Sequence, residues 1–371
     1  MHERPKRESV SRREALTAMF SLGTGLLFKT PVAQALDKLF TEHGMKLPNV
    51  EDREATREHF FRNKHVFENV LSHPAVLEIL NTPIDENLTP DHFRAIEEIM
   101  SILLSNWPTS YGKHVLHLPE YNPVAWFGHF PSEFVTVKNV KSGKKFIGNA
   151  TRLPDGTSLT AGHLLKDTAI PHKRSKDPHA DIAVFTPNKA IVTGASIAIK
   201  PVHYPPEQLR GKIVSIAGYN ANLDPHGYID TAQKVYVSGV IPITDVMGLY
   251  LYFHSRPDSK SSQVKNYTSF MSGNNSMNAF LATVGSNYRI LFRNLILLPA
   301  GETLGTTSTT SADNTDGMSG SGLLIHDKET KMTEVVGVFT HGIELYDPVR
   351  RVCFSTAQCC TDIADVVQAT K

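Results

Sequence analysis

The sequence predicts a mainly β protein preceded by a helical region. Three observations lead to this expectation: many short runs of β-branched and aromatic residues beyond residue 133, turn residues between them, and helix-like spacing of apolar residues before residue 107. Short strands separated by frequent turns are typical of an all-β barrel or sandwich. The expected strands are Phe134–Val137, Lys145–Leu153, Ser158–Thr160, Asp181–Phe185, Ala190–Ala198, Lys212–Ala217, Lys234–Ile243, Leu249–Phe253 and Arg289–Leu298.

Residues 1–35 predict an export signal peptide. An apolar or small stretch, Ala15–Phe28, follows a basic start and precedes the small-x-small pattern Ala33-Gln34-Ala35. The segment Ser11–Leu16 resembles the twin-arginine export motif, although Ala15 stands where a Phe is usual. We therefore expect a periplasmic or secreted protein, exported by the twin-arginine route, whose mature chain begins at Leu36. An amphipathic helix of the mature protein is the alternative.

Residues 36–125 predict a helical N-terminal region. Apolar residues recur with helical gaps in Glu51–Leu71, Pro74–Leu80 and Asp91–Leu104. A segment this short has limited capacity to bury its own apolar face, so we expect it to dock on the β unit that follows. It is either a pro-segment or regulatory region, or a packing accessory without inhibitory action.

Two later segments depart from the strand pattern. Ser255–Gly285 is rich in Ser, Asn and Gly and is expected to be a long insertion loop, whereas Ala357–Thr370 predicts a closing helix. The predicted division of the chain is thus a signal at 1–35, a helical region at 36–125 and a β domain at 126–371.

Composition excludes several classes of function. The net charge is only +1, which gives no electrostatic argument for a nucleic-acid partner. The three cysteines, Cys353, Cys359 and Cys360, are too few for a disulfide framework, and no His/Cys spacing suggests a metal. The apolar stretch near the N-terminus is too short to span a bilayer comfortably. We expect no metal, no cofactor and no stable membrane anchor.

Three short segments carry residues suited to nucleophilic catalysis. They are Leu159-Thr160-Ala161-Gly162-His163, Asp181-Ile182-Ala183-Val184-Phe185 and Asp316-Gly317-Met318-Ser319-Gly320-Ser321-Gly322. Each alone is a weak signal, but together they present a base, an acid and a nucleophile in the order His, Asp, Ser. Serine is a poor nucleophile until a neighbouring histidine takes its proton, and a carboxylate must hold that histidine in the correct tautomer.

These segments resemble the trypsin-like (chymotrypsin-fold) serine peptidase family over roughly residues 130–371. Thr-Ala-Gly-His matches the family's Thr-Ala-Ala-His, Asp-Ile-Ala-Val matches Asp-Ile-Ala-Leu, and Gly-Met-Ser-Gly-Ser-Gly matches Gly-Asp-Ser-Gly-Gly-Pro. The Ser-Gly-Ser variant and the lack of paired cysteines look more like the bacterial glutamyl-endopeptidase type. The resemblance implies two six-stranded antiparallel β-barrels, polypeptide substrates and a serine endopeptidase.

The resemblance also implies roles for individual residues. His163, Asp181 and Ser319 would form the catalytic triad, and the backbone N–H groups of Gly317 and Ser319 would form the oxyanion hole. The connection from His163 to Asp181 is short for this family, which makes Asp177 the nearest competitor for the acid. Asp177 ranks lower because it precedes Pro178 and lacks the Ile-Ala-Val strand that follows Asp181. Met318 replaces the Asp that pairs with a new N-terminus in digestive members, so that mode of activation is not expected.

Substrate-binding residues are less well defined. Asp313 lies six residues before Ser319, where trypsins carry the Asp that selects basic substrates. Thr340, His341 and Gly342 belong to the expected cleft-lining strand, where relatives that cleave after Glu use a histidine. The sequence leaves acidic and basic selectivity open.

Other functions remain as alternatives. The β domain could be a catalytically inactive trypsin-like barrel that binds peptides or proteins, or the helical region could carry an interaction function of its own. An α/β-hydrolase is disfavoured because its order is Ser, acid, His, and only a short tail follows Ser319.

Overall fold

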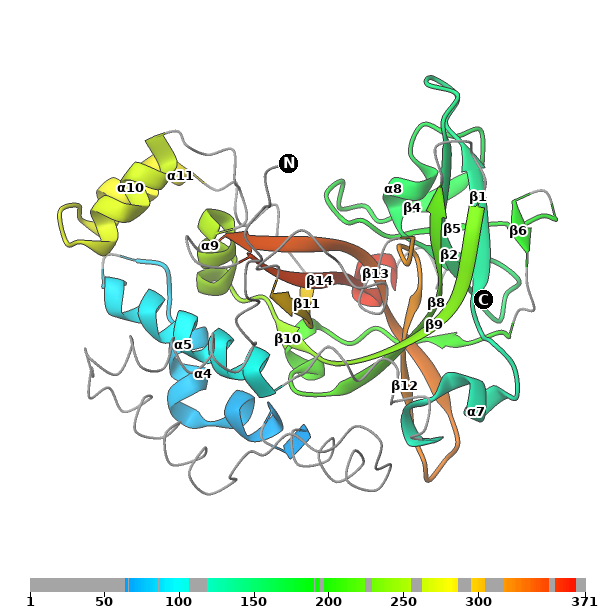
Figure 1. The fold of residues 1–371 in the computed structure, drawn as a ribbon, viewed down its shortest axis with the longest axis horizontal. Helices are drawn as coiled ribbons and strands as arrows, with labels where there is room; N and C mark the ends of the chain where they lie inside the picture. Colours follow the sequence, from blue (N-terminus) through cyan, green and yellow to red (C-terminus); the bar gives the residue numbers. More distant parts are fainter. Residues whose placement is uncertain are drawn as a thin grey trace, which may run out of the picture.

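The computed structural model describes residues 64–65, 67–85, 87–106, 119–189, 191–193, 197–223, 229–254, 262–285, 295–303, 317–346 and 351–364. The signal peptide predicted at residues 1–35 lies outside them. The described residues form two antiparallel sheets and a group of helices, and the second sheet stands between the helices and the first sheet (Figure 1). The expectation of two antiparallel β units with a helical N-terminal region is confirmed.

The first sheet has six strands in the described part of the chain, in the order β4-β5-β3-β2-β1-β6, and β4 is not among the strands expected from the sequence. They are β1 (Glu133–Lys138), β2 (Lys145–Arg152), β3 (Ser158–Thr160), β4 (His172–Arg174), β5 (Ala183–Phe185) and β6 (Val192–Thr193). The turn between β2 and β3 is the predicted Pro154-Asp155-Gly156, where Gly156 has φ +85°, a conformation that glycine adopts at no steric cost. Short helix α8 (Gly162–Leu165) follows β3 directly.

Polar groups tie this sheet together from inside. Glu133 is fully buried in β1 and pairs with the Arg152 guanidinium of β2. Its second oxygen accepts a hydrogen bond of 2.6 Å from the Ser158 hydroxyl of β3. A buried carboxylate is tolerable only when it is paired and hydrogen-bonded. Here the carboxylate fixes the register of three neighbouring strands.

The second sheet has eight strands in the described part of the chain, in the order β10-β11-β14-β13-β12-β8-β9, with β7 pairing in parallel with β13. They are β7 (Lys200–Pro201), β8 (Ile213–Leu223), β9 (Ile229–Gly239), β10 (Ile241–Pro242), β11 (Leu295–Thr303), β12 (Gly322–His326), β13 (Thr333–Tyr346) and β14 (Arg351–Cys359). Short 3₁₀ turns η4 (Pro206–Leu209) and η5 (Cys360–Ile363) flank it. The predicted cleft-lining segment, residues 337–342, lies in β13.

The helices gather at the β10–β11 end of the second sheet. The N-terminal helices are α4 (Pro74–Leu80) and α5 (Pro90–Asn106), and residues 64–65 and 67–72 are also helical. Three more come from between β10 and β11: α9 (Asp245–His254), α10 (Ser262–Met271) and α11 (Met277–Val284).

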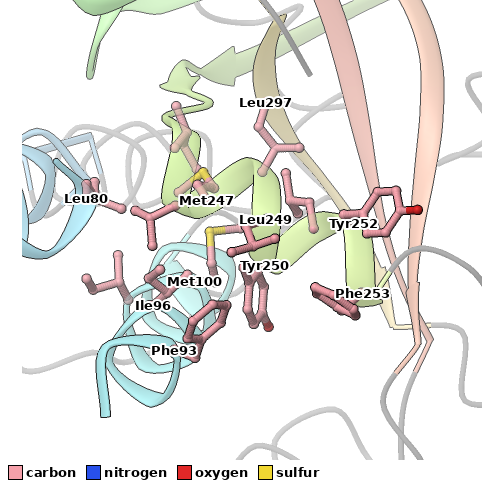
Figure 2. Packing of buried hydrophobic residues seen from close by; sticks show 14 of the residues in the cluster. Leu80, Phe93, Ile96, Met100, Met247, Leu249, Tyr250, Tyr252, Phe253 and Leu297 are labelled. Atoms are coloured by element: carbon pink, nitrogen blue, oxygen red, sulfur yellow. The ribbon is translucent and has the colours of Figure 1, made fainter. Parts of the chain in front are cut away.

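One hydrophobic cluster joins all of these helices to the sheet. Figure 2 shows Leu80, Phe93, Ile96 and Met100 of α4 and α5 against Met247, Tyr250 and Phe253 of α9, with Leu297 of β11 close by. The ring of Phe67 lies so close to Gly239 of β9 that a Cβ there would overlap it. The expected docking of the helical region on the β unit is therefore confirmed. Neither His163 nor Ser319 belongs to this cluster.

Two expectations for the segment between β10 and β11 are wrong. Leu249–Phe253, expected as a strand, lies in helix α9, whose residues 246–253 are all buried. A segment that is apolar on every side carries no periodicity to distinguish helix from strand. Ser255–Gly285, expected as a loop, contains α10 and α11; the Ser276 hydroxyl caps α11 by accepting from the Ala279 N–H.

The expected closing helix Ala357–Thr370 is also wrong at its start. Residues 357–359 complete strand β14, which pairs with both β11 and β13. Only a short 3₁₀ turn, η5, and the single residue Ala364 follow in the described part of the chain. Pairing on both sides satisfies the backbone groups of these residues and overrides their helical pattern.

The connector before β1 is clamped onto the second sheet. It contains η3 (Pro119–Tyr121) and α7 (Pro123–Phe127), which Asn122 caps. The Trp126 ring stacks on the His326 ring of β12, with centroids 4.5 Å apart and planes 12° apart, and the Trp126 indole donates to the Pro119 carbonyl at 2.8 Å. These contacts show why the connector carries aromatic residues.

This stack predicts a dependence of stability on pH. Burial lowers the pKa of His326 below its usual value near 6.5, so the unfolded chain takes up the proton first as the pH falls. The free energy of unfolding should therefore decrease as the pH drops below about 6.5, and the loss should level off below the folded-state pKa. The substitution His326→Phe keeps a ring for the stack and removes the titration. Melting temperatures at pH 7.5 and 5.5 should differ less in His326→Phe than in the wild type; equal differences would contradict this interpretation.

Candidate active site

Strand pairing brings the predicted base and acid together. His163 lies in α8, three residues beyond the end of β3, and Asp181 lies two residues before the start of β5. Since β3 and β5 pair antiparallel with Thr160 opposite Ala183, the end of one strand meets the start of the other. The short connection between the two residues is sufficient because it folds back as β4, which pairs with β5.

The Asp181 carboxylate holds His163 at two points. One oxygen lies 2.7 Å from His163 Nδ1, and the other accepts from the His163 backbone N–H at 2.7 Å. This arrangement orients the ring and leaves Nε2 as the nitrogen that can accept a proton. The imidazole is 43% exposed and the carboxylate 21% exposed, so the pair lies open at the surface.

Asp177, the weaker candidate for the acid, has a different role. Its carboxylate accepts from the His179 N–H at 3.0 Å, and its carbonyl accepts from the Ala180 N–H. These bonds stabilise the turn that leads into Asp181. The structure thus places Asp181, and not Asp177, in contact with His163.

Ser319 comes from the second sheet, just before β12, and its loop is clamped against the first sheet. The Ser319 carbonyl accepts from the Asn149 N–H of β2 at 2.7 Å, and the Gly320 N–H donates to the Phe339 carbonyl of β13 at 2.8 Å. Gly320 has φ +90°, and a Cβ there would overlap the Asn149 carbonyl and the Thr160 hydroxyl. Only glycine fits, and the serine is thereby held beside β3, the strand that leads into α8 and His163.

Asn149 is the central polar link between the two sheets, and sequence reasoning missed it. Its side chain donates to the Gly317 carbonyl at 2.8 Å and to the Tyr219 carbonyl at 3.0 Å, and it accepts from the Tyr219 N–H at 2.6 Å. The residue is fully buried. A buried amide with three partners fixes the groups it joins, because any displacement leaves polar atoms unpaired. No motif or spacing in the sequence distinguishes Asn149 from other asparagines.

The Ser319 hydroxyl donates to the Thr340 carbonyl of β13 at 2.7 Å. Among the described residues no hydrogen bond joins it to His163. Thr340 itself is buried, and its hydroxyl bonds to Thr356 of β14. The structure therefore brings Ser319 beside Thr340, whereas Asp313 and the side chain of His341 lie outside what it describes; Gly342 is placed only as a residue of β13.

Two backbone N–H groups beside Ser319 lack an acceptor among the described residues. The N–H groups of Gly317 and Ser319 donate no hydrogen bond to any described residue. Gly317 has φ +79°, and Asn149 fixes its carbonyl. Met318, between them, is buried among apolar residues of the second sheet, so it anchors the loop through packing and not through an ion pair.

A second sheet-to-sheet contact supports the acid. Gln358 of β14 is buried, and its side-chain oxygen accepts from the Asp181 backbone N–H at 3.3 Å. This contact crosses 177 residues of sequence, and no sequence pattern could have indicated it. Together with Asn149, Gln358 ties each half of the site to the opposite sheet.

The described parts of the chain contain neither a metal-binding cluster nor a membrane-spanning helix. No cluster of three or more His, Cys, Asp or Glu side chains is arranged to hold a metal ion. None of the helices described combines the length and the apolar character needed to cross a membrane. Cys359 and Cys360 are both fully buried.

Comparison with known proteins adds little beyond the fold. No family model matches the chain, and no curated protein matches it. Solved structures do match: an inactivated protease paralogue of the scabies mite, S-I1, at 12% identity and a TM-score of 0.36, covers 64% of this chain and 92% of its own. A structure described as HL collagenase, at 12% identity and a TM-score of 0.34, covers 65% and 94%. At these scores neither likeness bears on the site.

Proposed function

We propose that this protein is a serine endopeptidase with His163 as the base, Asp181 as the acid and Ser319 as the nucleophile. The observation that carries the proposal is the double contact of Asp181 with His163. A carboxylate that binds both the ring Nδ1 and the backbone N–H fixes the ring and its tautomer, which a general base requires. A histidine kept for packing alone has no need of that arrangement on an open surface.

The nucleophile needs one local change to act. Its hydroxyl must leave the Thr340 carbonyl and donate instead to Nε2 of His163. Catalytic hydrogen bonds are often absent in unliganded sites and form when substrate arrives. The Asn149 N–H holds the Ser319 backbone in place during this change.

The reaction then follows from the groups present. Ser319 Oγ attacks the peptide carbonyl carbon while its proton passes to His163 Nε2, and the N–H groups of Gly317 and Ser319 stabilise the oxyanion. The C–N bond breaks as His163 returns the proton to the leaving amine. Water, deprotonated by His163, attacks the acyl-enzyme; the acid product leaves and Ser319 Oγ regains the proton.

The motif resemblance supports the glutamyl-endopeptidase type within this proposal, and polypeptides are the expected substrates. One observation favours a second candidate, an inactive barrel that binds peptides. The Ser319 hydroxyl is already satisfied by the Thr340 carbonyl, as it would be in a protein that never uses it.

A fluorophosphonate probe separates the two functions, because it reacts only with an activated serine. The wild-type protein should be labelled and Ser319→Ala should not. Ser321→Ala is a matched control: this second serine of the same loop is buried, and its hydroxyl has no hydrogen-bond partner among the described residues, so labelling should persist. A folded wild-type protein that resists the probe would favour the binding module.

A further inference from the structure

The loop between the base and the acid is rich in positive charge. Residues 164–180 contain four cationic side chains and two acidic ones, Asp167 and Asp177. Both acidic side chains already bind other groups of the protein. Asp167 forms a 2.6 Å ion pair with Lys141, and the hydrogen bond from Lys141 lowers the pKa of Asp167, which therefore stays ionised. Asp177 stabilises the turn before Asp181. The cations are Lys166, Lys173, Arg174 and Lys176.

One of these cations lies directly beside the candidate dyad. Arg174 ends β4, and its guanidinium lies over Gly162, the residue before His163. A Cβ built on Gly162 would lie 2.7 Å from Arg174 Nη2 and 3.2 Å from Nε. The guanidinium thus fills the space that an alanine side chain would occupy, next to the backbone of the base.

Arg174 has no partner within the described part of the chain. It is exposed, and no described carboxylate or carbonyl pairs with its guanidinium. An arginine that serves structure alone is usually paired, whereas a free guanidinium presents several N–H donors in a planar fork that matches a carboxylate. This free guanidinium lies next to the backbone that carries the exposed His163.

We propose that Arg174 forms a substrate subsite, next to His163, which selects an acidic side chain near the bond to be cleaved. The subsite is separate from the pocket for the residue whose carbonyl is attacked, which β13 would line. This inference rests on the proposed function. The remaining cations of the loop strengthen the local positive field, so the preference for acidic peptides should weaken as salt is added.

The test compares two mixtures of decapeptides. In the first mixture each peptide carries Glu at one position, which differs from peptide to peptide, and in the second mixture Gln replaces that Glu. Products are identified by mass spectrometry. The wild type should cleave peptides with Glu at one fixed position near the scissile bond about tenfold faster, measured as kcat/KM, because a charge-assisted pair forms. Arg174→Gln should lose this preference. Lys173→Gln removes the same charge from the neighbouring strand position, which faces the other side of the sheet, and should keep it.

A second variant moves the guanidinium without removing its charge. Gly162→Ala introduces a Cβ 2.7 Å from Nη2 and 3.2 Å from the Ile182 backbone nitrogen, so the flexible arginine must shift and the preference should fall. Retention of the full preference in Arg174→Gln would overturn the proposal. So would an Arg174→Gln variant in which only the pH profile changes, because that result would assign the arginine to the dyad and not to the substrate.

The two proposals fail in different ways. If the wild type cleaves no peptide and resists the fluorophosphonate probe, the peptidase proposal fails. The subsite is then tested by binding: immobilised Ser319→Ala protein should retain Glu peptides over their Gln counterparts, and Arg174→Gln in the same background should not. Equal retention of both mixtures by both proteins would refute the acidic subsite.

Discussion

Peptide hydrolysis should fall by about 10⁴- to 10⁶-fold in kcat when His163 is replaced by alanine, because a triad acts as a unit. The fold should survive, since His163 is partly exposed and contributes no core packing. Circular dichroism and the melting temperature would verify the fold, and cleavage of a fluorogenic peptide would measure kcat.

The acid of the proposed triad can be tested by comparing substitutions at Asp181 and Asp177. Asp181→Asn keeps the shape of the side chain but removes the charge that stabilises the imidazolium, so kcat should again fall by about 10⁴-fold. Asp177→Asn is the matched control, because Asp177 lies in the same turn and does not contact His163. Near-full activity in Asp181→Asn, with loss in Asp177→Asn, would reverse the assignment.

Loss of the Asn149 side chain is expected to affect both stability and activity. Asn149→Ala leaves the Gly317 carbonyl and both backbone groups of Tyr219 without their partners in a partly buried place. Buried groups left unpaired cost about 1–3 kcal/mol each, less any relief by water, so the free energy of unfolding should fall by about 3 kcal/mol. Thermal melting and urea unfolding would measure this loss.

Activity should fall in the same variant for a geometric reason. Without Asn149 the Gly317 carbonyl is free to turn, and the N–H groups of the proposed oxyanion hole lose their fixed direction. A misdirected oxyanion donor costs about 10²- to 10³-fold in kcat, with little change in KM because the substrate pocket remains. Asn139→Ala is the matched control: this asparagine caps an exposed turn. Equal melting temperatures and equal kcat in the two variants would show that Asn149 links nothing of importance.

The helices show where sequence patterns suffice. The apolar residues of α5 recur at helical spacing, and those buried at Phe93, Ile96, Met100 and Leu103 form one face of the structure's helix. The same logic gave the bounds of α4 at Pro74 and Leu80. Where one face is buried and the other is solvated, periodicity carries the information. In α9 every face is buried, and the information is absent.

In the candidate site, too, some features follow from local sequence patterns and others only from tertiary contacts. The amino-acid sequence by itself determined the mainly β class, the docked helical region and the residue types His163, Asp181 and Ser319 in their order, because local patterns and motifs record them. Tertiary structure alone decided the rest. The pairing of β3 with β5 places Asp181, and not Asp177, next to His163. Asn149 and Gln358 each form hydrogen bonds between the two sheets. The tertiary structure also places Arg174 over Gly162. Each of these contacts joins residues distant in the chain or on separate strands, and their energies exist only once the strands have paired.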